Sequence, residues 1–305
     1  MAKHITADYI NERMKNGVCD YIEQCEKAYQ SQVEKAAKEV CLKKGRQLIM
    51  LAGPSSSGKT TTARLIKEYA RKEGRKATVV SLDDFYRDQT RMLYFEDGTP
   101  DFETVEALDK EYISACLSSL TEKGEADLPR FCFLSKRREK DLVKTQVGED
   151  EIIIVEGLHA INPIITKGLP DEKITRMYVS VSSRIYDKED VLFSKRDLRF
   201  IRRLIRDYHY RNSSVENTFL LWKGVRMGED RYLFPFSHLA DVKIDSIHPY
   251  EPCLFKNEAV KLLSHIQKDS EYYETAREYI NKLSLFSEAD SLCVPESSLL
   301  HEFIG

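Results

Sequence analysis

Eight consecutive residues constrain this chain more than any other feature of its sequence. They read Gly53-Pro54-Ser55-Ser56-Ser57-Gly58-Lys59-Thr60 and match the pattern G-x-x-x-x-G-K-T. The two glycines allow backbone conformations that turn successive N–H groups inward, where they can hold phosphate oxygens. An apolar run at 48–52 precedes the loop and predicts a buried strand, and 59–73 predict a helix whose N-terminus adds positive potential. The pattern therefore predicts a phosphate-binding loop at the start of a helix.

The loop also assigns individual roles. Lys59 is expected to reach the β- and γ-phosphates of a nucleotide, and the Thr60 hydroxyl to bind Mg²⁺. We therefore expect ATP and Mg²⁺ as cofactors. The nucleotide-binding residues predicted from the loop and the helical turn after it are Gly53, Ser55, Ser56, Ser57, Gly58, Lys59, Thr60 and Thr61.

The order of the apolar runs predicts the fold class. Residues 77–82 form a second run after the helix, and a strand, a helix and a strand in close succession indicate a βαβ unit in a parallel sheet. The predicted fold is α/β, a doubly wound, mostly parallel sheet of the P-loop NTPase type with an inserted Arg-rich helical lid. Further strands are expected at 152–155, 176–181 and 240–244, and helices at 19–44, 105–120, 195–211 and 256–285.

We place an N-terminal helical extension at 1–45 and the P-loop domain at 46–305, with the lid at about 190–237. The helix at 19–44 is expected to pack on the domain that follows it, with packing on a partner helix as the alternative. Homo-oligomerisation is left open by the sequence.

Composition narrows the class of protein. The chain has 305 residues, 42% of them apolar, and a net charge of −3, which argues against a general nucleic-acid binder. No run of about 18 apolar residues predicts a membrane span. The seven cysteines show no close C-x-x-C spacing, and no signal peptide is recognised. We therefore expect a cytoplasmic protein with reduced thiols.

Acidic residues end two of the predicted strands. Asp83 and Asp84 close the second strand, and Glu156 follows the apolar run at 152–155. Ligands gather at the carboxyl ends of parallel strands, so these carboxylates are candidates for the same site. We assign Asp83 as general base or metal-side acid and Glu156 as a metal-side acid. For Asp84 the sequence does not decide between a site residue and a turn or helix cap.

Basic residues concentrate in the predicted helix at 195–211. Arg199, Arg202, Arg203 and Arg206 recur at helical spacing, and such a row can face a triphosphate and stabilise charge in the transition state. Arg203 and Arg206 are the predicted catalytic members, with a solvated helix face and a nucleic-acid stripe as alternatives.

Two smaller features carry weaker signals. The run Lys136-Arg137-Arg138 is either a solvated face or part of the site. His159 and His209 are lone histidines, and a structural role is expected for both.

Together these motifs resemble the uridine kinase and phosphoribulokinase family of P-loop kinases. That family carries GxSxSGKT, a D-x-F-Y motif, an acidic "EG" after an apolar strand and an "RRxxRD" helix. The matching segments here are Gly53–Thr60, Asp83–Tyr86, Glu156-Gly157 and Arg202–Asp207.

The resemblance is closer to a bacterial branch of that family. Long members of the branch place the kinase module after a region similar to the N-terminal part of threonyl-tRNA synthetase, and this chain starts shortly before the module. The matching segments are Asp101-Phe102-Glu103, Pro129–Phe133, Lys136–Glu139, Val155–Pro163, Gly228-Glu229, Phe234-Pro235-Phe236 and Pro295–Gly305.

The resemblance implies an ATP-dependent kinase in which Asp83 deprotonates an acceptor hydroxyl, Thr60 and Glu156 serve the metal, and Arg203 and Arg206 contact phosphates. The acceptor-binding residues expected from it are Asp83, Tyr86, Phe131, Lys136 and Arg138. One departure concerns the acceptor. Uridine kinases read the pyrimidine with a Tyr and a His, and Phe131 and Lys136 stand at those positions here.

We therefore expect a kinase for a hydroxyl on a small molecule, in first place a nucleoside. A sugar, polyol or sugar phosphate is the alternative acceptor, because Lys136 and Arg138 could suit an anionic one. An alternative of another class is a nucleotide-dependent switch or RNA-associated factor. The chain lacks the Asn-Lys-x-Asp signature of guanine-nucleotide switches, and its net charge disfavours RNA.

Overall fold

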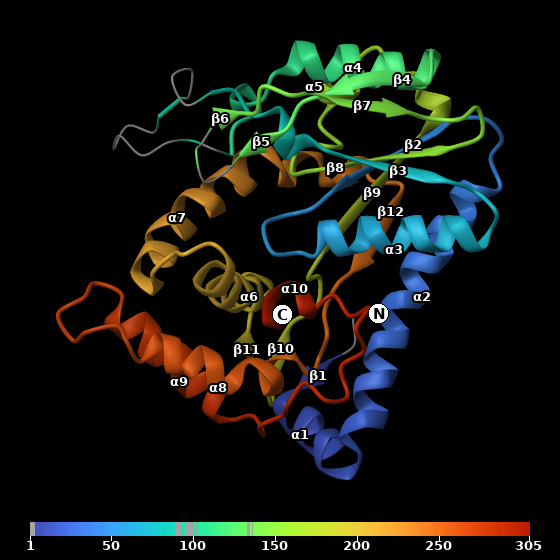
Figure 1. Ribbon diagram of the computed structural model, residues 1–305. Helices are drawn as coiled ribbons and strands as arrows, with labels where there is room; N and C mark the ends of the chain where they lie inside the picture. The colour runs from blue at the N-terminus through green and yellow to red at the C-terminus, as the bar shows by residue number, and fades with distance from the viewer. Residues whose placement is uncertain (1–3, 89–92, 95–100, 102, 133–134, 136) are drawn as a thin grey trace.

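Five parallel strands form the central sheet of the protein (Figure 1). The computed structural model describes residues 4–88, 93–94, 101, 103–132, 135 and 137–305. The strand order is β12-β9-β2-β8-β3, and every neighbouring pair is parallel. The strands are β2 (Gln47–Ala52), β3 (Ala77–Ser81), β8 (Ile152–Glu156), β9 (Ile174–Ser180) and β12 (Val242–Asp245). This order confirms the predicted α/β class with a mostly parallel sheet.

The sheet brings the predicted acidic residues to the phosphate-binding loop. Strand β2, which leads into the loop, lies between β8 and β9, where the strand order reverses. In such sheets, ligands bind outside the carboxyl ends of the strands at the point of reversal. Leu51 pairs with Glu156, and Glu156 also pairs with Ser81 on β3. The ends of β2, β8 and β3 therefore meet at one edge of the sheet.

Both faces of the sheet are covered, which explains why the strands β2 and β8 are mostly apolar and fully buried. Ile49 and Leu51 point into one core with α2 (Val18–Cys41), α3 (Lys59–Lys72), α6 (Lys195–Tyr210) and α8 (Glu251–Leu263). Leu48 and Met50 point into the other core with α4 (Lys110–Glu122) and α5 (Pro163–Thr166). The sequence predicted one helix at 105–120, but Val105–Ala107 form a 3₁₀ turn and Asp109 caps α4 by accepting the Tyr112 N–H.

The N-terminal segment packs on the sheet domain. Strand β1 (Ile5–Thr6) pairs with β10 (Ile185–Asp187), which pairs in turn with β11 (Asp190–Phe193). After α1 (Ala7–Asn16), helix α2 runs along α3, and its Tyr29 hydroxyl lies 2.7 Å from Thr62 Oγ1. The prediction that this helix packs on the following domain is confirmed.

The structure describes two further hairpins and three further α-helices. They are the hairpins β4 (Glu125–Leu128) with β7 (Val143–Gln146) and β5 (Phe131–Cys132) with β6 (Arg137–Arg138), and the helices α7 (Val215–Tyr232), α9 (Tyr273–Ser284) and α10 (His301–Ile304). In the part of the chain that the structure describes, every helix is too short or too polar to cross a bilayer.

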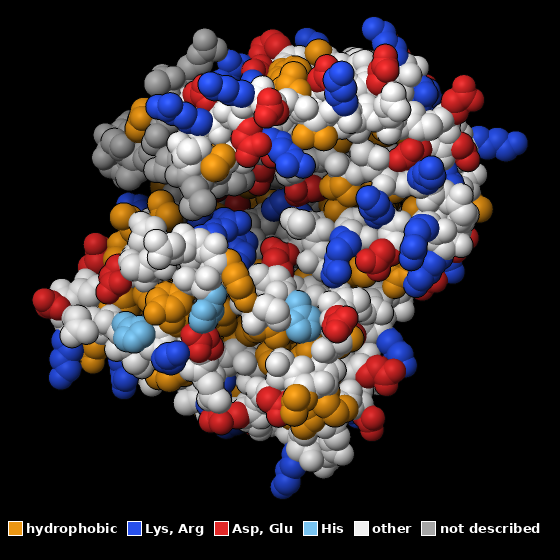
Figure 2. All heavy atoms as spheres, viewed as in Figure 1, with side chains coloured by type: hydrophobic (Ala, Val, Ile, Leu, Met, Phe, Trp, Pro, Cys, Tyr) orange, Lys and Arg blue, Asp and Glu red, His pale blue; other side chains and the backbone are white. Residues whose placement is uncertain are grey.

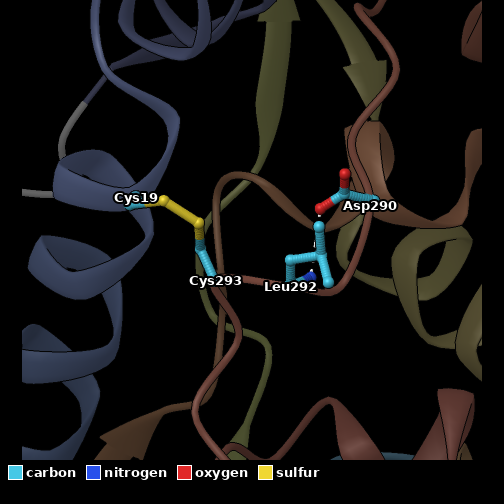
Figure 3. Close-up of a disulfide and its surroundings, with 4 residues drawn as sticks. All are labelled: Cys19, Asp290, Leu292 and Cys293. Atoms are coloured by element: carbon cyan, nitrogen blue, oxygen red, sulfur yellow. Dashed lines mark hydrogen bonds between the residues drawn. A yellow bond between two sulfur atoms is a disulfide. The ribbon is translucent and has the colours of Figure 1, made fainter.

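A disulfide joins two segments that are far apart in the sequence (Figure 3). Cys19, in the first turn of α2, bonds to Cys293, in the segment that leads to the C-terminus, with a Cα–Cα distance of 5.1 Å. The expectation that all thiols are reduced is therefore wrong for this pair. Spacing gave no signal, because the two cysteines are 274 residues apart and meet only through the tertiary fold.

Candidate nucleotide and acceptor site

A cavity of about 1100 Å³ lies at the carboxyl edge of the sheet. Figure 2 shows a hollow on this face, with basic and acidic side chains gathered in it. The P-loop residues Ser55–Thr60 line one part of the cavity, and α6 and α7 line another. The other predicted site residues that line it are Asp83, Tyr86, Phe131, Glu156, Arg203 and Arg206.

The P-loop has the features of a phosphate cradle. A Cβ at Gly53 would lie 2.2 Å from the Val179 carbonyl oxygen, so no other residue fits the close approach of loop and β9. The hydroxyls of Ser56 and Ser57 are buried, and among the described residues neither has a hydrogen-bond partner. Orphaned buried hydroxyls are costly unless a ligand satisfies them. The loop therefore fits the phosphates of a nucleotide.

Lys59 and Thr60 begin α3 and line the cavity. The ammonium group of Lys59 donates to the Pro54 carbonyl at 3.3 Å, which holds it across the loop. Thr60 is exposed toward the cavity. Both side chains therefore lie beside the loop from which the sequence predicted their roles.

Five acidic residues among those described line the cavity, namely Asp83, Glu103, Glu156, Glu271 and Glu302, and burial raises the pKa of two of them. Burial, reinforced by the nearby Asp83, raises the pKa of Glu156 to about 7, while the Ser81 hydroxyl donates to its Oε1 at 2.6 Å. Burial also raises the pKa of Glu103 to about 7; Arg203 opposes this shift, and Glu229 and Asp83 add to it. Acids with such perturbed pKa values are typical of active sites.

Thr60 and Glu156 fit a magnesium ion that is bound together with a nucleotide. Mg²⁺ in such sites takes one or two protein oxygens and completes its shell with phosphates and water. Across the described ranges, no group of three His, Cys, Asp or Glu side chains forms a cage for a metal. A hydroxyl and a carboxylate beside the P-loop match the smaller donor set that a nucleotide-bound Mg²⁺ needs.

The four arginines of α6 that the sequence put in one row divide into two pairs. Arg199 and Arg202 are fully buried and do not face the cavity. Arg199 binds both oxygens of Glu229 and donates to the Ser55 carbonyl at 2.9 Å. Arg202 binds both oxygens of Glu251 and donates to the Ser56 carbonyl at 3.3 Å. These two arginines therefore hold the backbone of the P-loop and do not line the cavity.

Arg203 and Arg206 line the cavity, as the sequence predicted. Arg203 donates to the Ser55 hydroxyl at 2.8 Å, and its Nε lies 3.0 Å from Asp207 Oδ2. Arg206 also binds Asp207, and Arg211 lies 3.6 Å from the same carboxylate. Three guanidinium groups thus share one carboxylate, which leaves positive charge beside the P-loop for an anion.

Helix α6 is a wall of the cavity in this structure. Its residues 198–207 are all buried, and the lid at about 190–237 stays a prediction from the sequence. The helix is fixed by the ion pairs of Arg199 and Arg202, which tie it to α7 and α8 as well as to the P-loop.

The predicted acceptor-binding residues fall in different places. Tyr86 and Phe131 line the cavity, with ring centroids 5.5 Å apart. Lys136 lies outside the described residues. The guanidinium of Arg138 contacts Asp109 and the carbonyls of Phe85 and Tyr86, each at 3.2 Å, so its described contacts are with protein groups.

Asp84, His159 and His209 each have a defined partner. The sequence left the role of Asp84 undecided and predicted structural roles for the two histidines. Asp84 accepts the backbone N–H of Phe131 at 3.2 Å, so it fixes the start of β5. His159 Nε2 lies 2.9 Å from the Glu103 carbonyl, and burial lowers the pKa of His159 to about 4. His209 pairs with Glu258 at 2.9 Å on the surface.

Sequence reasoning did not place Glu103, Glu229 or Glu302 in the site. Glu103 and Glu302 line the cavity, and Glu229 accepts the backbone N–H of Ser55 at 2.9 Å. All three lie in segments that resemble the bacterial branch. That resemblance was a signal for each of them, but it said nothing about a role.

Comparison with known proteins agrees with this geometry. Residues 48–250 match the model of the Phosphoribulokinase / Uridine kinase family. The chain belongs to this family. The match spans the sheet from β2 to β12 and includes the P-loop, Asp83, Glu156 and the arginines of α6.

Individual relatives are similar at a modest level. A uridine kinase of Clostridium novyi (strain NT) is 27% identical over 198 residues, which cover 65% of this chain and 86% of the relative. Uridine-cytidine kinase B of Dictyostelium discoideum is 26% identical, over 65% of this chain and 73% of the relative. A solved structure described as a possible uridine kinase from Bacillus stearothermophilus is 17% identical, with a TM-score of 0.48, over 70% of this chain and 98% of that one.

Family membership fixes the type of reaction. The chain is an ATP-dependent phosphotransferase, a kinase that transfers a phosphoryl group to an alcohol. The identity of the acceptor is a separate question.

Proposed function

We propose that this kinase phosphorylates a nucleoside and that the cavity binds nucleotide and acceptor side by side. The observation that carries the proposal is the juxtaposition of the P-loop, Asp83 and the ring pair Tyr86–Phe131 around one cavity. Two aromatic rings suit a base, which presents flat apolar faces. The relatives named as uridine kinases support the same acceptor class.

The residues of the chain have distinct proposed roles in the transfer. ATP supplies the γ-phosphoryl group and Mg²⁺ offsets its charge, with Thr60 and Glu156 as the protein side of the metal. Lys59 and Arg203 hold phosphate oxygens, and Arg206 stabilises the charge that develops during transfer. Asp83 accepts the proton of the acceptor hydroxyl as it attacks.

A sugar, polyol or sugar phosphate remains the alternative acceptor. The argument for an anionic acceptor rested on Lys136 and Arg138. Arg138 already has a carboxylate and two carbonyls as partners, so it is not a free anion-binding group. Membership in a family of kinases disfavours the switch or RNA-associated function. The closer likeness to the bacterial branch with the synthetase-like region stays a prediction from sequence.

A substrate panel tests the proposal. ADP release would be measured with ATP and Mg²⁺ against nucleosides, sugars, polyols and sugar phosphates, with Asp83→Asn as the blank. We expect release with uridine or cytidine and its loss in Asp83→Asn, while nucleotide binding persists. Release only with a sugar or a phosphorylated acceptor would replace the nucleoside proposal. Full activity in Asp83→Asn would remove Asp83 as the base.

A further inference from the structure

The C-terminal segment 295–305 lies outside the region that the family model matches, yet it reaches the P-loop. A Cβ at Gly58 would lie 2.1 Å from Leu299 Cδ1, so segment and loop are in direct contact. Figure 1 shows α10, within this segment, beside α6. The segment therefore belongs to the surroundings of the cavity, although the family match does not include it.

This segment is built into the core. Leu299, Leu300 and Phe303 are each 0% exposed and join the core that includes α2, α3, α6 and α8. The Arg202 guanidinium lies over the Phe303 ring, 5.5 Å from its centroid. To leave the loop, the segment would have to expose three buried apolar side chains to water, which is strongly unfavourable. The segment is therefore a fixed part of the cavity wall and does not move in and out of the site.

Polar contacts anchor the same segment to α2. The Ser298 hydroxyl donates to Glu26 Oε1 at 2.6 Å, and the Tyr250 hydroxyl donates to the same oxygen at 2.6 Å. Just upstream, Cys293 is bonded to Cys19 of α2. These contacts fix the position of α10 with respect to the P-loop helix, because α2 itself packs along α3.

Glu302 is the residue of this segment that lines the cavity. Its Oε2 accepts a hydrogen bond from the Thr61 hydroxyl at 3.3 Å, and its Oε1 lies 3.8 Å from Arg206 Nη1. Asp207 holds the Nε and Nη2 groups of the same guanidinium. Arg206 is therefore hydrogen-bonded by a carboxylate of its own helix and lies within ion-pair distance of a second carboxylate from the C-terminal segment.

We propose that residues 295–305 form a wall of the nucleotide site and that Glu302 is a positioning residue for Arg206 and Thr61. This inference rests on the proposed function of the P-loop cavity. Glu302 orients Arg206 for the phosphate that is transferred. Its own negative charge weakens the binding of phosphate in the ground state, since like charges repel at short range. Glu302 thus favours turnover at the expense of nucleotide affinity.

The substitution Glu302→Gln separates these two effects, because glutamine keeps an acceptor for Thr61 and loses the charge that holds Arg206. We expect kcat to fall about tenfold. This is the size of losing one charged hydrogen bond from Arg206 to the transferred phosphate in the transition state. We expect the Kd for Mg·ATP to fall by about two- to fivefold, because a negative charge leaves the phosphate site. Glu302→Asp, which keeps the charge on a shorter side chain, should restore part of kcat.

The matched control is Glu296→Gln, which removes the same charge from an exposed position in the same segment. Calorimetry on the full chain gives Kd for Mg·ATP without an acceptor, and turnover is measured with the best acceptor of the panel. If Glu302→Gln equals Glu296→Gln in both Kd and kcat, the inference is overturned. Weaker nucleotide binding with a lowered Tm and no rescue by Glu302→Asp would also overturn it, since that pattern marks a purely structural role.

One further variant distinguishes a failure of this inference from a failure of the proposed function. Lys59→Ala removes the ammonium group of the P-loop but leaves Glu302 in place. Wild-type nucleotide affinity in Lys59→Ala would place the nucleotide elsewhere and overturn the proposed function itself. Loss of affinity in Lys59→Ala, combined with no effect of Glu302→Gln, would overturn only the role of Glu302.

Discussion

Arg199 and Glu229 face each other across two hydrogen bonds, 2.6 Å from Nη1 to Oε1 and 2.7 Å from Nη2 to Oε2. Their side chains are 2% and 0% exposed. Both also contact the backbone of Ser55, because Glu229 accepts its N–H and Arg199 donates to its carbonyl. The pair therefore clamps one residue of the P-loop between α6 and α7, and the shape of the loop depends on helices that are distant in the sequence.

The first prediction concerns this clamp. Glu229→Ala would leave Arg199 as an uncompensated buried charge and Ser55 N–H without its partner. We expect the free energy of unfolding to fall by about 3 to 5 kcal/mol, together with a loss of nucleotide affinity. Urea unfolding and calorimetry would measure the two effects. The control is Asp230→Ala at the next position, which is exposed and pairs with Arg196, and its cost should stay below about 1 kcal/mol. Equal costs for the two variants would contradict the clamp.

A second prediction follows from the raised pKa of Glu103. Its ordinary value is 4.5, and burial raises it to about 7 in the folded protein. Neutral Glu103 therefore contributes stability that is complete below pH 4.5 and is lost as the pH rises through 7.

Glu103→Gln cannot ionise and lacks this dependence. Between pH 5 and pH 8 the wild type should lose about 2 kcal/mol of unfolding free energy relative to Glu103→Gln. Urea unfolding at both pH values measures the difference, with Glu106→Gln as a surface control on the same segment. A difference that does not change with pH would show that Glu103 is ionised throughout.

The third prediction concerns the disulfide. Peptide mapping without reductant should recover Cys19 and Cys293 as one linked species. A cross-link stabilises mainly by restricting the unfolded chain, so the double variant Cys19→Ser, Cys293→Ser should lose about 2 to 4 kcal/mol. Reductant should lower the stability of the wild type by a similar amount and leave the double variant unchanged. Cys41→Ser serves as a single-cysteine control, and recovery of both cysteines as free thiols would refute the bond.

Much of the fold could be predicted because its signals are local. The strands at 48–52 and 152–155 are continuous apolar runs that are buried on both faces of the sheet. The P-loop lies between a strand and a helix, so its place at the edge of the sheet followed from the α/β class alone. Glu156, which ends β8, was found for the same reason, and so was Asp83, which lies in the 3₁₀ turn Leu82–Phe85 directly after β3 and not in the strand itself.

The contacts between distant segments could not be predicted. Helical spacing put four arginines of α6 in one row, but it could not show that Glu229 and Glu251 neutralise two of them. Nor could it show that α6 is a buried wall, because a row of arginines normally indicates an exposed face. Glu302 lies more than 200 residues from Thr61, and only the tertiary fold brings the two together.

The last prediction tests how Arg138 acts on the acceptor. Its guanidinium donates to the carbonyls of Phe85 and Tyr86, and Arg138 pairs with Phe131 across the β5–β6 hairpin. It thereby connects the two segments that carry the cavity rings Tyr86 and Phe131. In Arg138→Ala we expect the KM for the acceptor to rise about tenfold, the effect of one or two lost hydrogen bonds from a charged group, with the Kd for Mg·ATP unchanged.

Lysine at this position keeps the charge but lacks the planar guanidinium that reaches both carbonyls. The KM of Arg138→Lys for the acceptor should therefore stay close to that of Arg138→Ala. Arg137→Ala is the matched control, because Arg137 is its exposed neighbour on the same strand. A rise in KM confined to phosphorylated acceptors, absent with nucleosides, would instead show that Arg138 binds the acceptor directly. In that case its contacts to Phe85 and Tyr86 would belong only to the state without acceptor.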